Sequence, residues 1–492
     1  MLPIFIIIPL AAAFLIPIAS KLRKGSAPLI ANISAGALLV FSLLSISWLK
    51  QGVQVYSVGG WKPPFGICMV LDGFTVLMLI VINLIGFLAL VYSVNYLKKY
   101  TSTYLYYTLF SLLLAGLNGI AISGDLFNLF VFLEISSIAS YALVAFGVES
   151  EELEASFKYL VLGNVADVII LFAIGIILGN ASTLNMADIS RTLSVSPSRD
   201  LILFSLGLFI MGFGLKAGLV PFHAWLADAH SSAPAPMSAM LSGVVIKTAG
   251  IYALTRVVFN VIGFNLTVSS IFTWLGIISM SVGVLLAIGQ WDFKRLLAYH
   301  SVSQIGYVIF GLGLGTPLGI IGGLFHLFNH SLFKSLLFLN SGAVEYSTGT
   351  RQLDKLGGLS GPMPITSSTS LIASLSIAGL PPLCGFWSKL IIIIAAFQAH
   401  NTIGAIVCIL VSMVTLASFL KVQKYAFTRK INDAVLAAKE VPFFMMISMV
   451  ALALLCIAVG LLFVPFINSM IKPAADVLLG GLDYATKILG AN

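Results

Sequence analysis

The chain has 492 residues, of which 59% are hydrophobic and only 9% charged, and its mean hydropathy is +1.06. This composition excludes an ordinary soluble globular protein and is typical of an integral membrane protein. The net charge of +8 does not coincide with a basic cluster interleaved with aromatic residues, so no nucleic-acid partner is predicted.

Apolar runs of about 20 residues recur along the whole chain, and each is long enough to cross the hydrocarbon core as a helix. The first is too long, and too poor in a small-residue cleavage site, to be a removable signal peptide, so it predicts a retained helix. No connection is long enough for a separate soluble domain. The sequence therefore predicts one all-α polytopic unit over 1–492, embedded in the lipid bilayer. About fourteen runs begin near Leu2, Leu29, Phe74, Tyr104, Leu126, Phe157, Leu201, Pro236, Ile271, Leu297, Pro317, Ile365, Thr402 and Phe443.

Basic residues are divided unequally between the loops of the two sides. Successive loops are assigned alternately to the two sides of the membrane. One side then holds about twice as many Lys and Arg residues as the other, and it carries Lys98, Lys99, Lys294 and Arg351. The positive-inside tendency then makes this side cytoplasmic. We expect a multi-pass protein of the cell (inner or plasma) membrane with both termini outside.

Glu134 lies near the middle of the fifth run, with Ser137 and Tyr141 at i+3 and i+7 on the same helical face. Ionisable groups at mid-membrane are costly and normally face a wet cavity or a partner. A carboxylate there can hold and release a proton or fix the charge of a lysine. The alternative is an ion pair that only orders two helices.

Asp167 and Asn164 lie one turn apart in the sixth run. Their oxygens are of the kind that a hard cation such as Na⁺ prefers, so the pair predicts a candidate cation site. A hydrogen bond that pairs two helices is an equally good interpretation.

Lysines rather than arginines occupy the middle of the runs, at Lys216, Lys247, Lys334 and Lys389. A desolvated lysine can lose its proton near neutrality, which an arginine cannot, and this choice favours proton transfer over static anchoring. Lys247 has about eleven residues of its own run on either side, too many for its side chain to reach an interface.

His326, His330 and Lys334 follow one another at intervals of four residues in GGLFHLFNHSLFKSLL. They therefore lie along one face of a helix, about one turn apart. Imidazole accepts and passes protons near pH 7, so this face predicts a proton relay. A metal site would need further ligands that the sequence does not offer, and none is predicted.

Two matching motifs interrupt long apolar runs, Gly-Leu-x-Pro at Pro221 and again at Pro381 and Pro382, each followed by a tryptophan. A broken helix at membrane depth is tolerated where it lines a cavity or is buried in protein. Five runs separate the broken seventh and twelfth helices, so the two copies have opposite orientation. This arrangement predicts inverted five-helix repeats over 104–259 and 271–424, an architecture of transporters.

The four cysteines show no CxxC pair or metal spacing, and the chain has no nucleotide-binding loop or dinucleotide fingerprint. We therefore expect buried thiols and no cofactor in this chain, which cannot itself be a redox catalyst. Whether it is a subunit of an oxidoreductase is left open.

The stretch PFHAWLADAHSSAPAPMSAMLSGVVIKTAGIY, preceded by LKAG, resembles the motif of the antiporter-like subunits shared by Mrp-type Na⁺/H⁺ antiporters, respiratory complex I and membrane-bound hydrogenases. The resemblance extends from about Asp72 to Lys424, and SLSIAGLPPLCGFWSKL is most similar to the Mrp D-type subunit. The resemblance implies other membrane subunits as partners in a hetero-oligomeric complex.

The resemblance also implies roles for individual residues. Glu134 matches the fifth-helix glutamate that pairs with the lysine of the broken seventh helix, here Lys216. Lys247 matches the central lysine, His330 the eleventh-helix histidine and Lys389 the terminal lysine of a proton path. Asp167 matches no position of the family pattern.

Three classes of function remain. The chain is an ion-translocating subunit of an Na⁺/H⁺ antiporter, moving H⁺ alone or H⁺ with Na⁺, or the same channel driven by redox chemistry on other subunits. The third class is a structural scaffold, which so many aligned titratable groups disfavour. An organic-solute carrier is disfavoured by the lack of a mid-run arginine that would bind a carboxylate.

Overall fold

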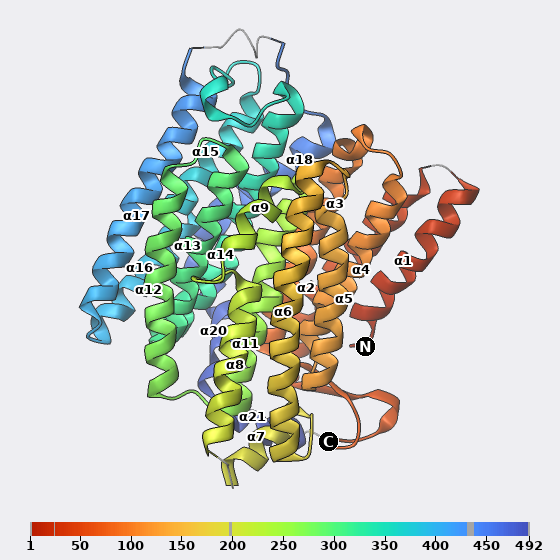
Figure 1. Cartoon of the computed structure of the whole chain (residues 1–492), viewed down its shortest axis with the longest axis vertical. Coiled ribbons are helices and arrows are strands. Elements are labelled where there is room, and N and C mark those ends of the chain that lie inside the picture. Colours follow the sequence, from red (N-terminus) through yellow and green to blue (C-terminus); the bar gives the residue numbers. More distant parts are fainter. Residues whose placement is uncertain (1, 24, 196–198, 431–436, 491–492) are drawn as a thin grey trace.

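The computed structural model describes residues 2–23, 25–195, 199–430 and 437–490. Long helices stand side by side with their axes roughly parallel, and α1 and α17 lie at opposite edges (Figure 1). The first half of this bundle contains α1 (Ile4–Leu22), α2 (Ser26–Leu49), α3 (Gly73–Tyr96), α4 (Thr103–Ile122), α5 (Leu126–Val144), α6 (Ser150–Ala181), α7 (Met186–Val195), α8 (Arg199–Ala217) and α9 (Ala224–Ser232).

The second half begins with a single helix over 235–262 that changes between α and π geometry. Its segments are α10 (Ala235–Met240), η3 (Leu241–Tyr252), α11 (Ala253–Arg256) and η4 (Val257–Ile262). The following long helices are α12 (Leu266–Ile288), α13 (Phe293–Gly313), α14 (Pro317–Thr348), α15 (Pro364–Ala378), α16 (Cys384–Gln398), α17 (Thr402–Val422) with η6 (Gln423–Thr428), and α18 (Phe443–Leu461).

Short elements cover the face of the bundle at which the chain ends. An antiparallel hairpin of β1 (Gln54–Ser57) and β2 (Cys68–Leu71) pairs Gln54 with Leu71 and Ser57 with Cys68. The C-terminal segment contains α19 (Phe463–Phe466), η8 (Ile467–Ile471), α20 (Lys472–Leu479), η9 (Gly481–Asp483) and α21 (Tyr484–Leu489). Sequence periodicity did not predict the hairpin, α7 or these short helices.

Eleven helices of the described residues are long and apolar enough to cross a membrane, so the chain is a multi-span membrane protein but the count of fourteen is not confirmed. The other three predicted runs fall on α13 and α14, which carry many polar residues, and on α15 and α16, which are two short helices. The predicted all-α class is confirmed.

The helix over 235–262 is the most enclosed element of the bundle. Every residue of its most apolar 18-residue stretch is buried, whereas only 33% of the residues are buried in the corresponding stretches of α1 and α2. Lys247 lies in the π-helical part of this helix. Because π segments are rare and tend to occur at functional sites, the centre of the bundle is where the site is expected.

Close packing in this centre depends on the absence of a side chain at Gly250. A Cβ added there would lie 2.6 Å from the Cα atom of Ala217 at the end of α8, a backbone contact that cannot be relieved by a rotamer change. Gly207, also on α8, has nothing within 4 Å of the same added atom.

We expect Gly250→Ala to lower the stability of the purified protein by about 1–3 kcal/mol, because the helix carrying Lys247 would be pushed away from α8. The measurement is the thermal unfolding midpoint in detergent. Gly207→Ala is the matched control and should be neutral or slightly stabilising, since alanine is the better helix former. Equal effects of the two substitutions would contradict the close contact between Gly250 and Ala217.

Candidate functional site: a row of buried titratable side chains

The first part of the site lies where α8 ends. Lys216 occupies the last turn of α8, before a break through Pro221 that leads into α9. Gly218 within the break adopts φ +68°, a conformation that residues with a side chain rarely take. The indole nitrogen of Trp225 donates to the carbonyl of Leu215 at 3.1 Å, which also accepts from the backbone of Gly218, so the tryptophan ties α9 to the end of α8.

The ammonium of Lys216 is held by three side chains. It lies 2.7 Å from Oδ2 of Asp167, donates to Ser137 Oγ at 2.9 Å and to the hydroxyl of Tyr141 at 3.3 Å. Both members of the ion pair are buried, with side chains 3% and 6% exposed. The lysine is thus a charged group whose hydrogen bonds are provided by α5 and α6.

The structure corrects the predicted partner of Lys216, because its direct counter-ion is Asp167 rather than Glu134. Glu134 lies beside the pair, close enough to both Asp167 and Lys216 to interact with their charges. The three groups form one cluster of two carboxyls and one ammonium.

The candidate cation site of Asp167 and Asn164 is not assembled as predicted. Asn164 is exposed on α6, whereas Asp167 is buried and its carboxylate is taken by an ammonium. Residues three apart differ by about 60° in direction around a helix axis. At the border of the buried face of α6, this difference is enough to turn Asp167 inward and Asn164 outward.

Lys247 lies at the middle of the bundle and is fully buried. Its ammonium donates to the carbonyl of Ser242, five residues earlier in the π-helical segment η3. The helix is tied to α13 by the hydroxyls of Ser242 and Ser301, which are 2.8 Å apart.

The predicted face of α14 is present. The rings of His326 and His330 stack with centroids 6.2 Å apart and an angle of 12° between their planes. His326 contacts Ser388 Oγ at 3.0 Å and Gln304 Oε1 at 3.2 Å. Both ring nitrogens of His330 and the ammonium of Lys334 are buried without a hydrogen-bond partner among the described residues. Water would be needed at these positions, either to hydrogen-bond with the buried polar groups or to pass a proton between them.

The last part of the site lies at the break between α15 and α16. Lys389 on α16 donates to the carbonyl of Ile377 at 2.7 Å and to Ser412 Oγ at 3.3 Å, and its ammonium lies 5.0 Å from the centre of the Tyr307 ring. Pro381 and Pro382 form the break, and Gly379 adopts φ +82° there, as Gly218 does in the first break. A cavity of about 260 Å³ reaches the lysine.

A polar vestibule lies at the bundle face that carries Lys99, Lys294 and Arg351, called the basic face below. Its volume is about 520 Å³. Lys294 on α13, 2% exposed, lies 3.0 Å from Glu345 on α14 and donates to the carbonyl of Ala233 at 3.1 Å.

His230 on α9 is a further candidate, which the sequence patterns did not indicate. It is fully buried, neither ring nitrogen has a partner among the described residues, and it is close enough to Lys247 and Lys334 to interact with their charges. It follows the first helix break directly, and Ser232 and Ala233, two and three residues later, line the vestibule. The repeated histidine of the motif HAWLADAH was the available clue.

Broken helices with titratable side chains at each break, joined by further such groups across the bundle centre, define an ion-translocating membrane protein. Comparison with known proteins makes this assignment specific. Residues 123–415 match the family NADH:quinone oxidoreductase/Mrp antiporter, TM, and residues 56–107 match NADH-Ubiquinone oxidoreductase (complex I), chain 5 N-terminus. The chain belongs to this antiporter-like family.

Relatives in the family include antiporter and respiratory proteins. The chain is 38% identical over 396 residues to the D-type subunit of the Na(+)/H(+) antiporter of Alkalihalophilus pseudofirmus, covering 80% of each protein. It superimposes on a chain of the Mrp complex from Dietzia sp. DQ12-45-1b with a TM-score of 0.93 at 28% identity, covering 99% of each chain. It also superimposes on a chain of the membrane-bound sulfane sulfur reductase, an archaeal respiratory membrane complex. The TM-score is 0.91 at 29% identity, covering 99% of each chain.

We expect Asp167→Ala to destabilise the protein by about 3 kcal/mol, because it leaves the buried ammonium of Lys216 without its counter-ion. Thermal unfolding in detergent measures the effect. Asn164→Ala, one turn away and exposed, should change stability by less than about 0.5 kcal/mol. A Glu134→Ala variant that is more damaging than Asp167→Ala would restore Glu134 as the main partner.

Proposed function

We propose that this chain is the proton-translocating membrane subunit of a multi-subunit complex of the Mrp antiporter type, similar to the D-type subunit. The observation that carries the proposal is the set of buried titratable groups between the two helix breaks, in which Lys247, His330 and Lys334 are close enough for their charges to interact. Protons enter from the vestibule on the basic face, pass His230 and the cluster around Lys216 to Lys247, and reach Lys389 through His326, His330 and Lys334.

The transported ions are H⁺, alone or exchanged for Na⁺, and the chain needs no cofactor of its own. The vestibule supports the basic face as the entry side, since it combines volume with polar lining next to the buried groups. The excess of lysine and arginine on this face supports placing it in the cytoplasm. The chain then lies in the cell membrane with both termini outside.

The matched helix breaks support the division into two inverted repeats, 104–259 and 271–424. Each break has a glycine of positive φ, a proline and a nearby tryptophan that stacks on an aromatic ring, Trp225 on Tyr159 and Trp387 on Phe463. The lysines differ in place, since Lys216 precedes its break and Lys389 follows its break.

A second candidate function is the same proton path in a redox-driven complex. The similarity to a chain of the sulfane sulfur reductase supports this alternative. Mass spectrometry of the subunits that co-purify after mild detergent extraction of native membranes separates the two. Only small hydrophobic subunits and a larger antiporter-like chain are expected for an antiporter, whereas stoichiometric iron–sulfur, NiFe or flavin subunits would assign the chain to a redox pump.

We expect Lys247→Ala to abolish cation-dependent proton movement while the complex still assembles, because the centre of the path would lose its proton carrier. The measurement is ΔpH formation in inside-out vesicles that hold the whole complex, followed with a pH-sensitive dye. Lys62→Ala, in the exposed hairpin loop, is the matched control and should transport at the normal rate. Full transport by Lys247→Ala would remove the central step of the proposal.

A further inference from the structure

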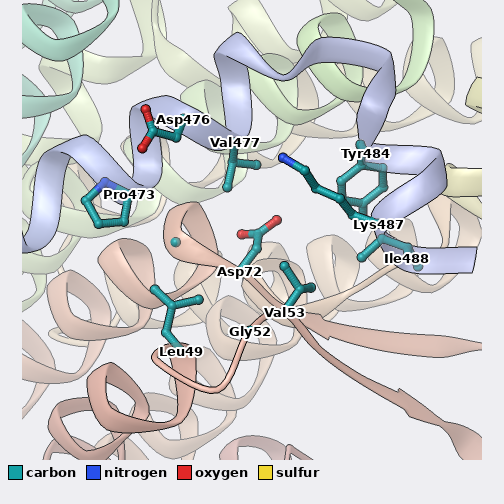
Figure 2. Close-up of a pocket in the computed structure, with 11 residues that line it drawn as sticks. Leu49, Gly52, Val53, Asp72, Pro473, Asp476, Val477, Tyr484, Lys487 and Ile488 are labelled. Atoms are coloured by element: carbon teal, nitrogen blue, oxygen red, sulfur yellow. The ribbon is translucent and has the colours of Figure 1, made fainter. Parts of the chain in front are cut away.

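The helix that carries Lys247 ends next to a second cavity, on the opposite side of the bundle from the vestibule. This cavity of about 220 Å³ lies between the end of α2, the start of α3 and the C-terminal helices. Figure 2 shows Asp72 at its centre, with Lys487 and Tyr484 on one side and Leu49 and Val53 on the other. Asp476 and Lys487 are exposed, so the cavity is open to the surface there, called the C-terminal face below.

A fully buried ion pair lies between this cavity and the interior. The guanidinium of Arg256 binds both carboxylate oxygens of Asp72, at 2.7 and 2.9 Å, and the two side chains are 2% and 1% exposed. Arg256 also donates to Tyr252 at 3.0 Å, Thr75 at 3.1 Å and Asn260 at 3.3 Å. The guanidinium carbon lies 5.2–5.4 Å from the ring centres of Phe74, Tyr252 and Tyr484.

Arg256 follows Lys247 by nine residues on one continuous helix, which places it about 13 Å further along the axis. Between them lie Thr248, whose hydroxyl is buried without a hydrogen-bond partner among the described residues, and Tyr252, whose hydroxyl donates to the carbonyl of Ala121. Measured along the helix, this end is the nearest point at which a proton on Lys247 could leave toward the C-terminal face.

An arginine cannot pass a proton along this route, because its guanidinium stays protonated. The carboxylate of Asp72 compensates the positive charge of Arg256, so the pair interrupts the route by offering no exchangeable proton rather than by repelling protons. The hydrogen bonds and surrounding rings hold the guanidinium in place, so the ion pair is a fixed interruption of this route.

We propose that Arg256, positioned by Asp72, closes the short route from Lys247 to the C-terminal face and so directs protons along α14 to Lys389. The inference rests on the proposed proton path. Arg256 is a positioning residue that gives the transfer its direction. Without it, a proton on Lys247 would leak through the cavity before reaching the second helix break.

The test is passive proton flux through the intact complex in sealed proteoliposomes, driven by a potassium diffusion potential and followed with an internal pH dye. Replacing both partners, Asp72→Asn with Arg256→Gln, keeps the shapes and removes the charges. We expect the flux to rise about tenfold, as a barrier lowered by roughly 1.4 kcal/mol would produce. Adding Lys247→Ala to the double variant should return the flux to the normal level.

Ser190→Ala is the matched control for a purely structural role. Ser190 on α7 donates to the carbonyl of Leu482 at 3.5 Å and is not a hydrogen-bond partner of Arg256, so this change loosens the C-terminal segment without altering charge or the ion pair. The flux should stay normal. Three results would each overturn the proposal. They are a proton flux in this control variant equal to that of the double variant, a double variant whose flux stays at the normal level, and a raised flux that persists when Lys247→Ala is added.

A second experiment keeps the ion pair intact, so it does not depend on folding of the double variant. A small ammonium-bearing thiol reagent should modify Asp476→Cys at the cavity mouth but not Thr248→Cys behind Arg256, and the four native cysteines are buried. Modification of both positions at similar rates would overturn the proposal. These readouts are separate from the transport assay, which tests the proposed function itself.

Discussion

The arrangement of this protein depends on how it accommodates lysine ammonium groups inside a membrane. Each such group costs at least about 2.5 kcal/mol at mid-membrane unless a partner or water meets it. The structure provides a different partner at each position: a carboxylate for Lys216, a π-helix carbonyl for Lys247 and the carbonyl at a helix end for Lys389. The chemical nature of the partner decides how strongly each lysine holds its proton.

The helix breaks affect which partners are available. A regular helix uses all its internal carbonyls, whereas a break leaves some of them free inside the bundle. At the first break the carbonyl of Leu215 accepts from both Gly218 and Trp225, and Lys216 is bound by side chains instead. At the second break Lys389 itself takes the carbonyl of Ile377. The two motifs are alike in sequence but leave their lysines in different chemical surroundings.

Much of this architecture could be predicted from the sequence. Run length predicts the membrane helices, Gly-Leu-x-Pro predicts the breaks, and a spacing of four residues predicts the shared face of His326 and His330. The pairing of Lys216 with Asp167 could not be predicted, because α5, α6 and α8 are apolar on nearly all sides and periodicity does not fix their rotation about their axes. His230 was missed since α9 is too short to show a period.

The distribution of hydrogen-bond partners along the row suggests why a proton would move through it. Lys216 and Lys389 at the two breaks are well partnered, whereas His330 and Lys334 between them have no hydrogen-bond partner among the described residues. In the proposed path a proton would thus be stabilised at the ends and only transiently carried in the middle, where water would have to assist it. Arg256 belongs to neither group, because its five hydrogen bonds and its counter-ion make its charge permanent. A path needs groups that exchange protons and a boundary that does not, and the helix over 235–262 contains both.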